Sequence, residues 1–222
     1  PADAEIILEG EICPDYKVEE GPFGEYTGYR TSPRDFRVTF RVNCITYRNN
    51  ATMTISNMGV PQDEGQLLRS FSLGLELEKL LKSQGIPITG VYMHPRSTHH
   101  MMIVGVKPTY SGIAQQIGQL AFGSKLGPWF HMVMVVDDKT DIYNWDEVYH
   151  AFCTRCHPAN GIHIYKNTTG TPLYPFATPH ERKHSIGSKV LFDCLWPVDW
   201  DPVNDVPTTV SFKSVYSQEI QD

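Results

Sequence analysis

The sequence predicts an α+β fold, and three patterns along its 222 residues support this prediction. In the first quarter, apolar and polar side chains alternate, which is typical of strands that bury one face. Leucines then recur at helical spacing through residues 63–84. From residue 85 onward, strand-like and helix-like segments alternate, as in domains that pack helices against a sheet.

Residues 4–58 are predicted to form a mostly antiparallel β region. A strand-like run begins at Ala4–Leu8, and Phe36–Val42 alternates apolar with polar side chains, so we expect one face of that strand to be buried. Asn49 and Asn50 supply turn chemistry before a further predicted strand at 53–55.

A long helix is predicted for residues 63–84. Asp63 follows Pro61 and is a residue type that caps helix N-termini, whereas Gly85 followed by Pro87 is a stop signal. The helical spacing is that of Leu73, Leu77, Leu80 and Leu81. One apolar face of this helix should therefore pack against the rest of the protein.

Strands and helices alternate beyond this helix. We predict a strand at Met101–Val106, a helix at 111–122, a buried strand at Met132–Val136 and a short helix from Trp145. Residues 166–205 are rich in Pro, Gly, Thr and Asn, so they are predicted to be loop-rich and to wrap over another element.

Composition and charge exclude several classes of function. With 41% hydrophobic and 20% charged residues the chain is globular, and 19 Lys+Arg against 25 Asp+Glu give a formal net charge of −6. This balance disfavours binding to nucleic acids or anionic membranes. No apolar run approaches the ~20 residues of a membrane span, and no signal segment is visible, so we predict a soluble protein.

The cysteines and the chain ends add two expectations. Five cysteines are an odd number and too few for a disulfide scaffold, which predicts a reducing, cytoplasmic location. The chain has no initiator Met and no evident terminal element, so it is predicted to be a fragment.

A pair of carboxylates is the strongest candidate for chemistry. Glu20 and Glu25 flank a turn that contains Gly21, Pro22 and Gly24, and this turn could present both side chains to one site. Two close carboxylates resist simultaneous ionisation, so one of them can stay protonated and act as a general acid. The alternative is an acidic turn that only faces solvent.

The same segment resembles the UbiD family of prenylated-flavin-dependent (de)carboxylases. The matching strings, in family order, are Ala4–Gly10, Glu20–Glu25 with Thr27–Tyr29, Ile45–Asn50, Val135–Asp138 with Asp141–Tyr143, Thr154–Pro158 and Gly187–Val190. The order and spacing agree over nearly the whole chain. The Glu-Gly-Pro-Phe-Gly-Glu string makes the resemblance quite specific.

The resemblance implies an activity and roles for three residues. Members are reversible, non-oxidative decarboxylases of aromatic, heteroaromatic or α,β-unsaturated acids, and they use prenylated FMN with Mn²⁺ and K⁺. By position, Glu25 matches the proton donor, Glu20 its partner in a Glu–Arg–Glu network, and Lys189 a lysine that contacts the flavin phosphate. A flexible ammonium in a Gly-Ser-Lys turn would suit that contact.

The resemblance also implies an architecture and partners. Residues 1–62 match the rear part of a split β-barrel flavin-binding domain, 63–84 a connecting helix, and 85–222 a C-terminal α/β domain used for oligomer contacts. The network arginine and the metal ligands lie upstream in the family, so none is assigned in this chain, which alone is expected to be inactive. Expected partners are an aromatic or unsaturated acid, the upstream half, further copies in a homo-oligomer, and a UbiX-type flavin prenyltransferase that supplies the cofactor.

Substrate-side residues are a weaker expectation. Tyr26 directly follows the expected proton donor, and Gln66 and Arg69 lie early in the predicted helix. Together they would favour a polar or hydroxylated aromatic acid. The alternative is a loop tyrosine beside a helix turn that faces solvent.

Three further groups have a structural interpretation. Without the resemblance, Lys189 and the run Arg182–His184 would be a solvated basic loop. Cys153 and Cys156, with His150 and His157 nearby, lack a second ligand pair, which favours structural packing over a zinc or redox site. The pair His99–His100 precedes an apolar strand without a carboxylate close in sequence, so it stays unassigned.

Two other classes of function stay open. The first is a non-catalytic assembly subunit or domain of a larger carboxylase, which would show no flavin-dependent turnover. The second is a hydrolase that uses the carboxylate pair without a cofactor, as glycosidases do. Turnover without flavin would favour the hydrolase.

Overall fold

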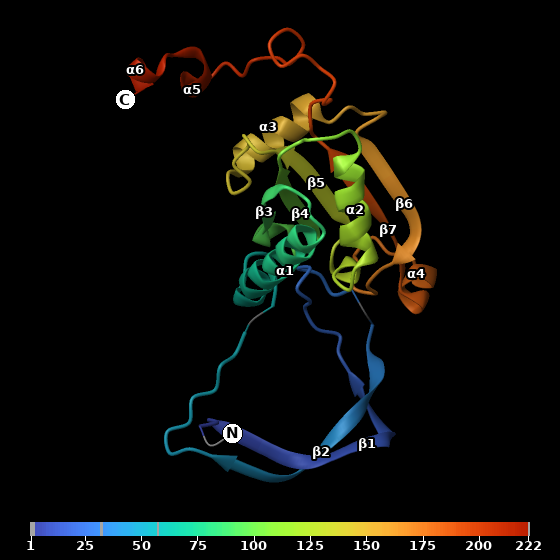
Figure 1. Cartoon of the computed structure of the whole chain (residues 1–222). Coiled ribbons are helices and arrows are strands. Elements are labelled where there is room, and N and C mark those ends of the chain that lie inside the picture. Colours follow the sequence, from blue (N-terminus) through green and yellow to red (C-terminus); the bar gives the residue numbers. More distant parts are fainter. Residues whose placement is uncertain (1–2, 32, 57, 222) are drawn as a thin grey trace.

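The computed structural model describes residues 3–31, 33–56 and 58–221 and consists of a two-stranded ribbon, a sheet covered by helices, and a C-terminal arm (Figure 1). The predicted segments 1–62 and 85–222 also include Pro1, Ala2, Ser32, Asn57 and Asp222, which lie outside the described residues. The larger sheet is mixed, and helices cover both of its faces. The predicted α+β class is therefore confirmed.

The ribbon consists of β1 (Ile6–Glu20) and β2 (Asp35–Tyr47), which pair antiparallel. This agrees with the predicted strands, but the expectation of one buried face is wrong: both faces of β2 are largely exposed. Two strands without a third layer offer nothing to pack against. The predicted strand at 53–55 is also wrong, because this exposed segment has no pairing partner and no regular structure.

Helix α1 (Glu64–Ser83) confirms the predicted helix at 63–84. The Asp63 carboxylate accepts a hydrogen bond from the Gln66 backbone N–H at 2.9 Å, and the Gln66 side-chain oxygen accepts one from the Asp63 N–H at 3.0 Å. This reciprocal arrangement is a capping box. Gly85, with φ +75°, follows the helix in the left-handed region, where glycine has no steric cost.

The larger sheet has the strand order β3-β4-β5-β7-β6. Its strands are β3 (Ile88–Met93), β4 (Met101–Val106), β5 (Met132–Asp137), β6 (Ile162–Thr169) and β7 (Ile186–Asp193). The central pairs β4–β5 and β5–β7 are parallel, whereas β3 and β6 run antiparallel at the two edges. The carboxyl ends of β4, β5 and β7 therefore lie at one edge of the sheet.

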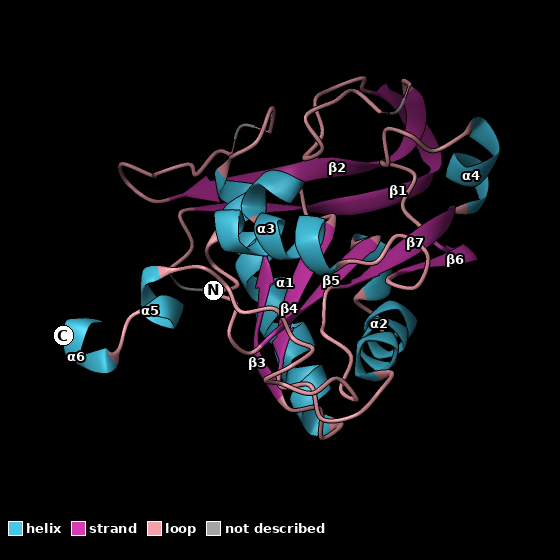
Figure 2. Ribbon diagram, turned by 90° about the horizontal axis from the view of Figure 1, so that it is seen from above, coloured by secondary structure: helices cyan, strands magenta, loops and turns pink. Residues whose placement is uncertain are grey.

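Helices pack on both faces of this sheet (Figures 1 and 2). Helices α1 and α2 (Ile113–Gly123) share one hydrophobic core with alternate residues of the central strands. Helix α3 (Trp145–Arg155) shares the second core with the residues between them. The short helices are η1 (Pro95–Ser97), η2 (Gly127–Trp129), α4 (Pro179–His184), α5 (Phe212–Val215) and α6 (Gln218–Gln221).

The prediction that residues 166–205 are loop-rich is wrong for the centre of this stretch. It contains β7, whose residues pair with both β5 and β6. Glycine and serine at the start of β7 weaken the strand pattern in the sequence, but ladder hydrogen bonds on both sides compensate. Strands β3 and β6 also had no counterpart among the predicted elements.

The C-terminal arm, residues 198–221, extends away from the sheet and ends in α5 and α6 (Figure 1). Within the described residues, no helix combines the length and the apolar character that crossing a membrane requires.

Candidate functional site

The loop that joins β1 to β2 carries Glu25 and contacts the sheet domain. Tyr26 and Thr27 are buried, although the strands on either side of the loop are exposed. The Arg182 guanidinium, at the end of the sheet domain, donates a hydrogen bond to the Thr31 carbonyl oxygen. The loop therefore links the ribbon to the sheet domain and fixes the position of Glu25 between them.

Glu25 is half-buried, and its backbone is held in a tight turn. The Glu25 N–H donates to the Tyr29 carbonyl at 3.0 Å, and the Gly28 N–H donates to the Glu25 carbonyl at 2.9 Å. Burial, and then the negative charge of Glu20, raise the pKa of the Glu25 carboxyl above its ordinary value. Both effects favour a neutral carboxylic acid, the form that can donate a proton.

Glu20 is exposed at the end of β1 and lies 3.7 Å from the Arg37 guanidinium. Its charge acts on Glu25, so the structure brings the two predicted carboxylates near each other. The two groups are in different environments, one half-buried and one in solvent. A pair with this asymmetry suits one protonated and one ionised carboxyl group.

The three residues predicted for the substrate side lie together. The Gln66 side-chain amide donates to the Tyr26 carbonyl oxygen at 2.6 Å. The Arg69 guanidinium carbon lies 5.9 Å from the Tyr26 ring centre and 4.6 Å from that of Trp129. The alternative of a solvent-facing turn is wrong for Tyr26 and Gln66, which are 6% and 0% exposed.

A groove of about 550 Å³ runs along the first turns of α1. Arg69, Lys125 and Glu76 line it together with Leu68 and Trp129, so its walls combine two cations and one carboxylate with apolar surface. The net positive charge and the apolar surface suit an anion that has an apolar body.

Lys189 lies in strand β7, and the expectation of a flexible turn or a solvated loop is wrong. Its side chain is 1% exposed, and its ammonium donates to the carbonyl oxygens of Gly127 at 2.5 Å and Phe130 at 3.0 Å. Burial lowers the pKa of Lys189 to about 8. Within the described residues, no carboxylate forms an ion pair with it. These two carbonyl oxygens use two of the three donors of the ammonium, and the centre of the Phe122 ring lies 5.6 Å from its nitrogen.

The residues Arg182–His184, also predicted as part of a basic loop, lie in α4. Lys183 and His184 are exposed there. Arg182 differs, because its guanidinium donates to carbonyl oxygens of Pro172 at 3.0 Å and Pro175 at 3.1 Å. It is therefore a structural brace for the segment before α4.

A cluster of histidines and tyrosines beside the Glu25 loop was missed by sequence reasoning. The ring centres of Tyr26 and His99 lie 5.1 Å apart, those of His100 and His131 4.8 Å apart, and those of His131 and Tyr174 4.8 Å apart. Burial is the main reason that the pKa of His100 falls to about 3 and that of His131 to about 4. These imidazoles are neutral at pH 7. The only sequence signal was the adjacent pair of histidines before β4.

Of the two cysteines at the end of α3, only Cys156, which follows the last helical residue, packs against the second hydrophobic core. Cys156 is half-buried, and its thiol donates to the Gly161 carbonyl oxygen at 3.6 Å, whereas Cys153 is exposed. Over residues 3–31, 33–56 and 58–221, no three His, Cys, Asp or Glu side chains are grouped so that they could hold a metal ion.

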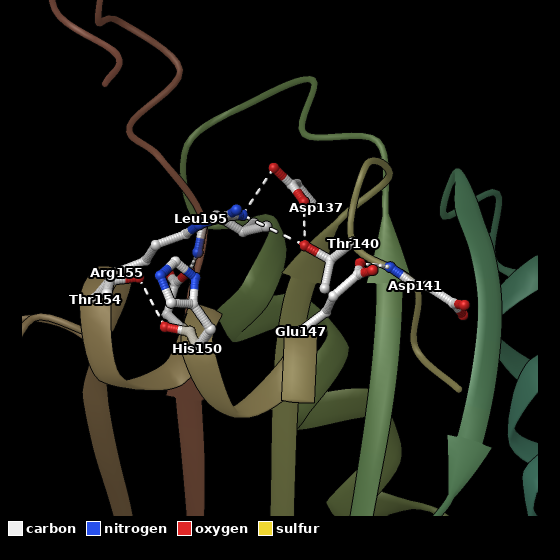
Figure 3. A network of polar contacts seen from close by, with 9 residues as sticks. Asp137, Thr140, Asp141, Glu147, His150, Thr154, Arg155 and Leu195 are labelled. Atoms are coloured by element: carbon white, nitrogen blue, oxygen red, sulfur yellow. Dashed lines mark hydrogen bonds and ion pairs between the residues drawn. The ribbon is translucent and has the colours of Figure 1, made fainter. Parts of the chain in front are cut away.

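A second cavity, of about 670 Å³, is lined by the start of α2, the end of α3 and the carboxyl end of β7. Arg155, at the end of α3, lines it and pairs with Asp137 at 2.9 Å. Figure 3 shows this pair with Thr140, whose hydroxyl donates to Asp137 at 2.6 Å. The network joins α3 to the end of β5.

Comparisons with known proteins match almost the whole chain. Residues 1–61 match the Rift-related domain of 3-octaprenyl-4-hydroxybenzoate carboxy-lyase, and residues 66–194 match its C-terminal domain. The phenolic acid decarboxylase of Sedimentibacter hydroxybenzoicus is 30% identical over 91% of this chain and 41% of its own length. Ferulic acid decarboxylase 1 of Saccharomyces cerevisiae is 28% identical over 100% of this chain and 46% of its own length.

Solved structures show the same likeness. The UbiD-class enzyme HmfF from Pelotomaculum thermopropionicum, in complex with FMN, superposes with a TM-score of 0.79 at 26% identity. The match covers 95% of this chain and 45% of that one. An evolved dimeric form of HmfF has been solved with prFMN. The chain therefore spans less than half the length of these relatives.

Proposed function

The chain belongs to the UbiD family of carboxy-lyases, and we propose that it contributes to the reversible, non-oxidative decarboxylation of an aromatic, heteroaromatic or α,β-unsaturated carboxylic acid. The observation that carries the proposal is Glu25, whose pKa is raised by burial and then by the Glu20 charge, which favours its neutral form. A neutral carboxyl group on a buried loop can protonate the carbon that loses carbon dioxide. The family membership and the decarboxylase relatives support this reaction.

We assign the cofactor role to prenylated FMN, which when bound supplies the electron sink for the departing carboxylate. Glu25 would donate the proton, and Glu20 would keep that proton on Glu25 through its negative charge. Lys189 would hold the phosphate with its remaining donor. Among the described residues no carboxylate pairs with this buried ammonium, and a buried charge favours a counterion, which supports that assignment.

Tyr26, Gln66 and Arg69 would form the substrate side. Arg69 brings a cation to the groove next to the Glu25 loop, where an acid substrate needs a counter-charge. Gln66 has its side-chain amide engaged with Asp63 and Tyr26, so it contributes by holding the wall in place.

The remaining expectations form one architectural proposal. Residues 1–62 would be the rear part of a split β-barrel that binds the flavin, 63–84 a connecting helix, and 85–222 a domain for homo-oligomer contacts. The upstream half would supply the arginine of the network and the ligands of Mn²⁺ and K⁺, and a UbiX-type prenyltransferase would supply the flavin. The greater length of the relatives supports a contribution from an upstream half. The odd number of cysteines supports a cytoplasmic location.

The assembly subunit and the hydrolase are less favoured. The curated relatives are named as decarboxylases, and the carboxylate pair lies in a segment that matches their family. A hydrolase would turn over its substrate without flavin, and an assembly subunit would show no flavin-dependent turnover.

The test is Glu25→Gln in the complete protein, loaded with prenylated FMN and supplied with Mn²⁺ and K⁺. We expect turnover of aromatic acids to fall by at least about 1,000-fold, because the amide has no transferable proton, while the flavin stays bound. Asp146→Asn, at an exposed carboxylate in the first turn of α3, is the control and should leave turnover unchanged. Substantial turnover by Glu25→Gln would refute the assignment.

A further inference from the structure

We propose that Gln66 is a positioning residue that holds the Glu25 loop against the start of α1, and that His99 braces Gln66 from the other side. This inference rests on the proposed function, because it explains how the proton donor is kept in place. It assigns Gln66 a task that differs from contact with substrate.

The contacts of Gln66 form a continuous chain from the helix cap to the loop. Its side-chain oxygen accepts from the Asp63 N–H at 3.0 Å, and its side-chain nitrogen donates to the Tyr26 carbonyl at 2.6 Å. Tyr26 directly follows Glu25, whose N–H and carbonyl are already tied to the same turn. The side-chain amide of Gln66 therefore satisfies the hydrogen-bonding needs of two backbone groups: the Asp63 N–H at the N-terminus of α1 and the Tyr26 carbonyl oxygen next to the proton donor.

Because Gln66 and Tyr26 are both buried, the loss of the hydrogen bonds between them would not be compensated by water. Gln66 is 0% exposed and Tyr26 is 6% exposed, so water cannot replace a lost bond at either group. A buried carbonyl oxygen that loses its hydrogen-bond donor is destabilising, so the loop would move until that oxygen finds another donor.

His99 braces the arrangement from the turn before β4. Its Nε2 lies 3.3 Å from the Gln66 carbonyl oxygen, its ring centre lies 5.1 Å from that of Tyr26, and the residue is 1% exposed. The backbone of this turn is strained, because both Thr98 and His99 have left-handed φ values, of 53° and 67°. Strain of this kind persists where the surrounding contacts require it, and it clusters at functional sites.

The consequence for the reaction is geometric. Proton transfer needs the acid within hydrogen-bonding reach of the reacting carbon, and a misplacement of about 1 Å can cost about 100-fold in rate. The bond from Gln66 ties the residue next to Glu25 to the first turn of α1. It therefore contributes to the position of Glu25.

Two substitutions at residue 66 separate this role from helix capping. Gln66→Glu keeps the acceptor for Asp63, and glutamate is a normal capping-box residue, but its carboxylate cannot donate to Tyr26. Gln66→Met has a similar volume and loses both bonds. Gln119→Met, on an exposed position of α2, is the matched control.

Turnover is measured in the complete, flavin-loaded protein. We expect kcat to fall about 10- to 100-fold in both Gln66 variants with KM within about two-fold of wild type, because the interaction acts on proton transfer and not on substrate binding. For Gln66→Glu, the ratio of its kcat to that of wild type should rise as the pH falls, since a protonated carboxyl can donate to Tyr26 again. The titratable and charged groups near this position are Glu25, Asp63, Arg69 and His99. The ratio is therefore read at pH values below the alkaline limb of the kcat profile of both proteins, where Glu25 is protonated in each.

A second measurement does not need catalysis. Amide hydrogen exchange of residues 25–29 should speed up in Gln66→Met, whereas exchange in β4 and β5 should stay as in wild type. If a Gln66 variant does not fold, His99→Phe takes its place: it keeps a ring beside Tyr26, removes the bond to Gln66, and should lower kcat by a smaller factor.

The proposal would be overturned if the folded Gln66 variants kept wild-type kcat, or if His99→Phe kept it where that variant replaces them. It would also be overturned if the kcat ratio for Gln66→Glu did not change with pH. Glu25→Gln distinguishes this failure from that of the proposed function. If Glu25→Gln abolishes turnover and the Gln66 variants do not, only the positioning role is wrong.

Discussion

Glu25 and Glu20 differ in their surroundings, and this difference predicts the pH dependence of the reaction. Glu25 acts in its protonated form, so turnover should fall as the pH rises through its pKa. Burial and then the Glu20 charge raise that pKa. Removing the charge with Glu20→Gln lowers the pKa of Glu25, so the alkaline limb of the kcat profile should move to lower pH.

The measurement is kcat across the pH range in the complete protein. The pH at which the alkaline limb of the kcat profile lies is the diagnostic quantity. The height of the plateau is not, because Glu20→Gln also lowers the maximal kcat if Glu20 belongs to the Glu–Arg–Glu network. Glu19→Gln, at the neighbouring exposed glutamate, should leave the limb in place. A limb that does not move in Glu20→Gln would show that the two carboxyl groups are not coupled.

Lys189 gives a prediction about cofactor affinity. A charge-assisted hydrogen bond contributes about 1.5–3 kcal/mol, so Lys189→Met should weaken flavin binding by about tenfold or more. The pKa of Lys189 is lowered to about 8, and the flavin affinity of the wild type should therefore begin to fall above about pH 8, whereas Lys189→Met should lack that step. Fluorescence titration with FMN measures both, and Lys183→Met, on exposed α4, is the control. Equal affinities would leave Lys189 as a brace for Gly127 and Phe130.

The sequence predicted which candidate residues lie near each other better than it predicted the environment of each. Glu20 and Glu25 flank a glycine–proline turn, a local pattern, and the structure brings them near each other. The burial of Lys189 and the contact of His99 with Tyr26 depend on segments more than 60 residues apart. Periodicity over a short window carries no information about such contacts.

At the scale of elements, the ion pair between α3 and β5 predicts a difference in stability. The Arg155 and Asp137 side chains are 13% and 11% exposed, and Thr140 completes their hydrogen bonds (Figure 3). Arg155→Met leaves the Asp137 carboxylate buried without its partner, so the free energy of unfolding should fall by about 3 kcal/mol.

The exposed pair of Arg37 and Asp35 is the matched control, because both of its side chains are 56% exposed. Arg37→Met should cost less than about 1 kcal/mol, since water screens the pair. Urea denaturation followed by circular dichroism measures both variants. Equal losses would mean that the network in Figure 3 adds no stability beyond that of a surface pair.

Elements with strong periodicity were predictable, and those defined by long-range pairing were not. Helix α1 and strand β4 were found with their limits nearly unchanged, because leucine spacing and a buried apolar run identify them locally. In strand β7, Gly187 and Ser188 follow the first residue, Ile186, in a stretch rich in turn residues, and pairing with β5 and β6 makes it a strand. The segment 53–55 has strand-like alternation but no neighbour to pair with.

At the scale of the whole molecule, the ribbon differs from the sheet domain in what it leaves uncovered. The sheet has a core on each face, whereas β1 and β2 expose large apolar side chains such as Ile12, Phe36 and Tyr47, at 71%, 59% and 75%. Exposed apolar surface of this extent marks a place where other protein segments pack. The relatives are more than twice as long as this chain, so they carry further residues that could cover the corresponding strands.

The exposed ribbon gives a prediction that can be tested without a substrate. We expect backbone amides of residues 6–20 and 35–47 to exchange with deuterium at least about tenfold more slowly in the complete protein than in this chain, because covering strands protect both faces. Strands β4 and β5 already lie between two hydrophobic cores and should exchange at the same rate in both samples. Mass spectrometry of peptic peptides compares the four segments in one experiment. Equal exchange of the ribbon in both samples would contradict its assignment to a barrel, whereas slower exchange confined to the ribbon would support a flavin domain completed by residues outside this chain.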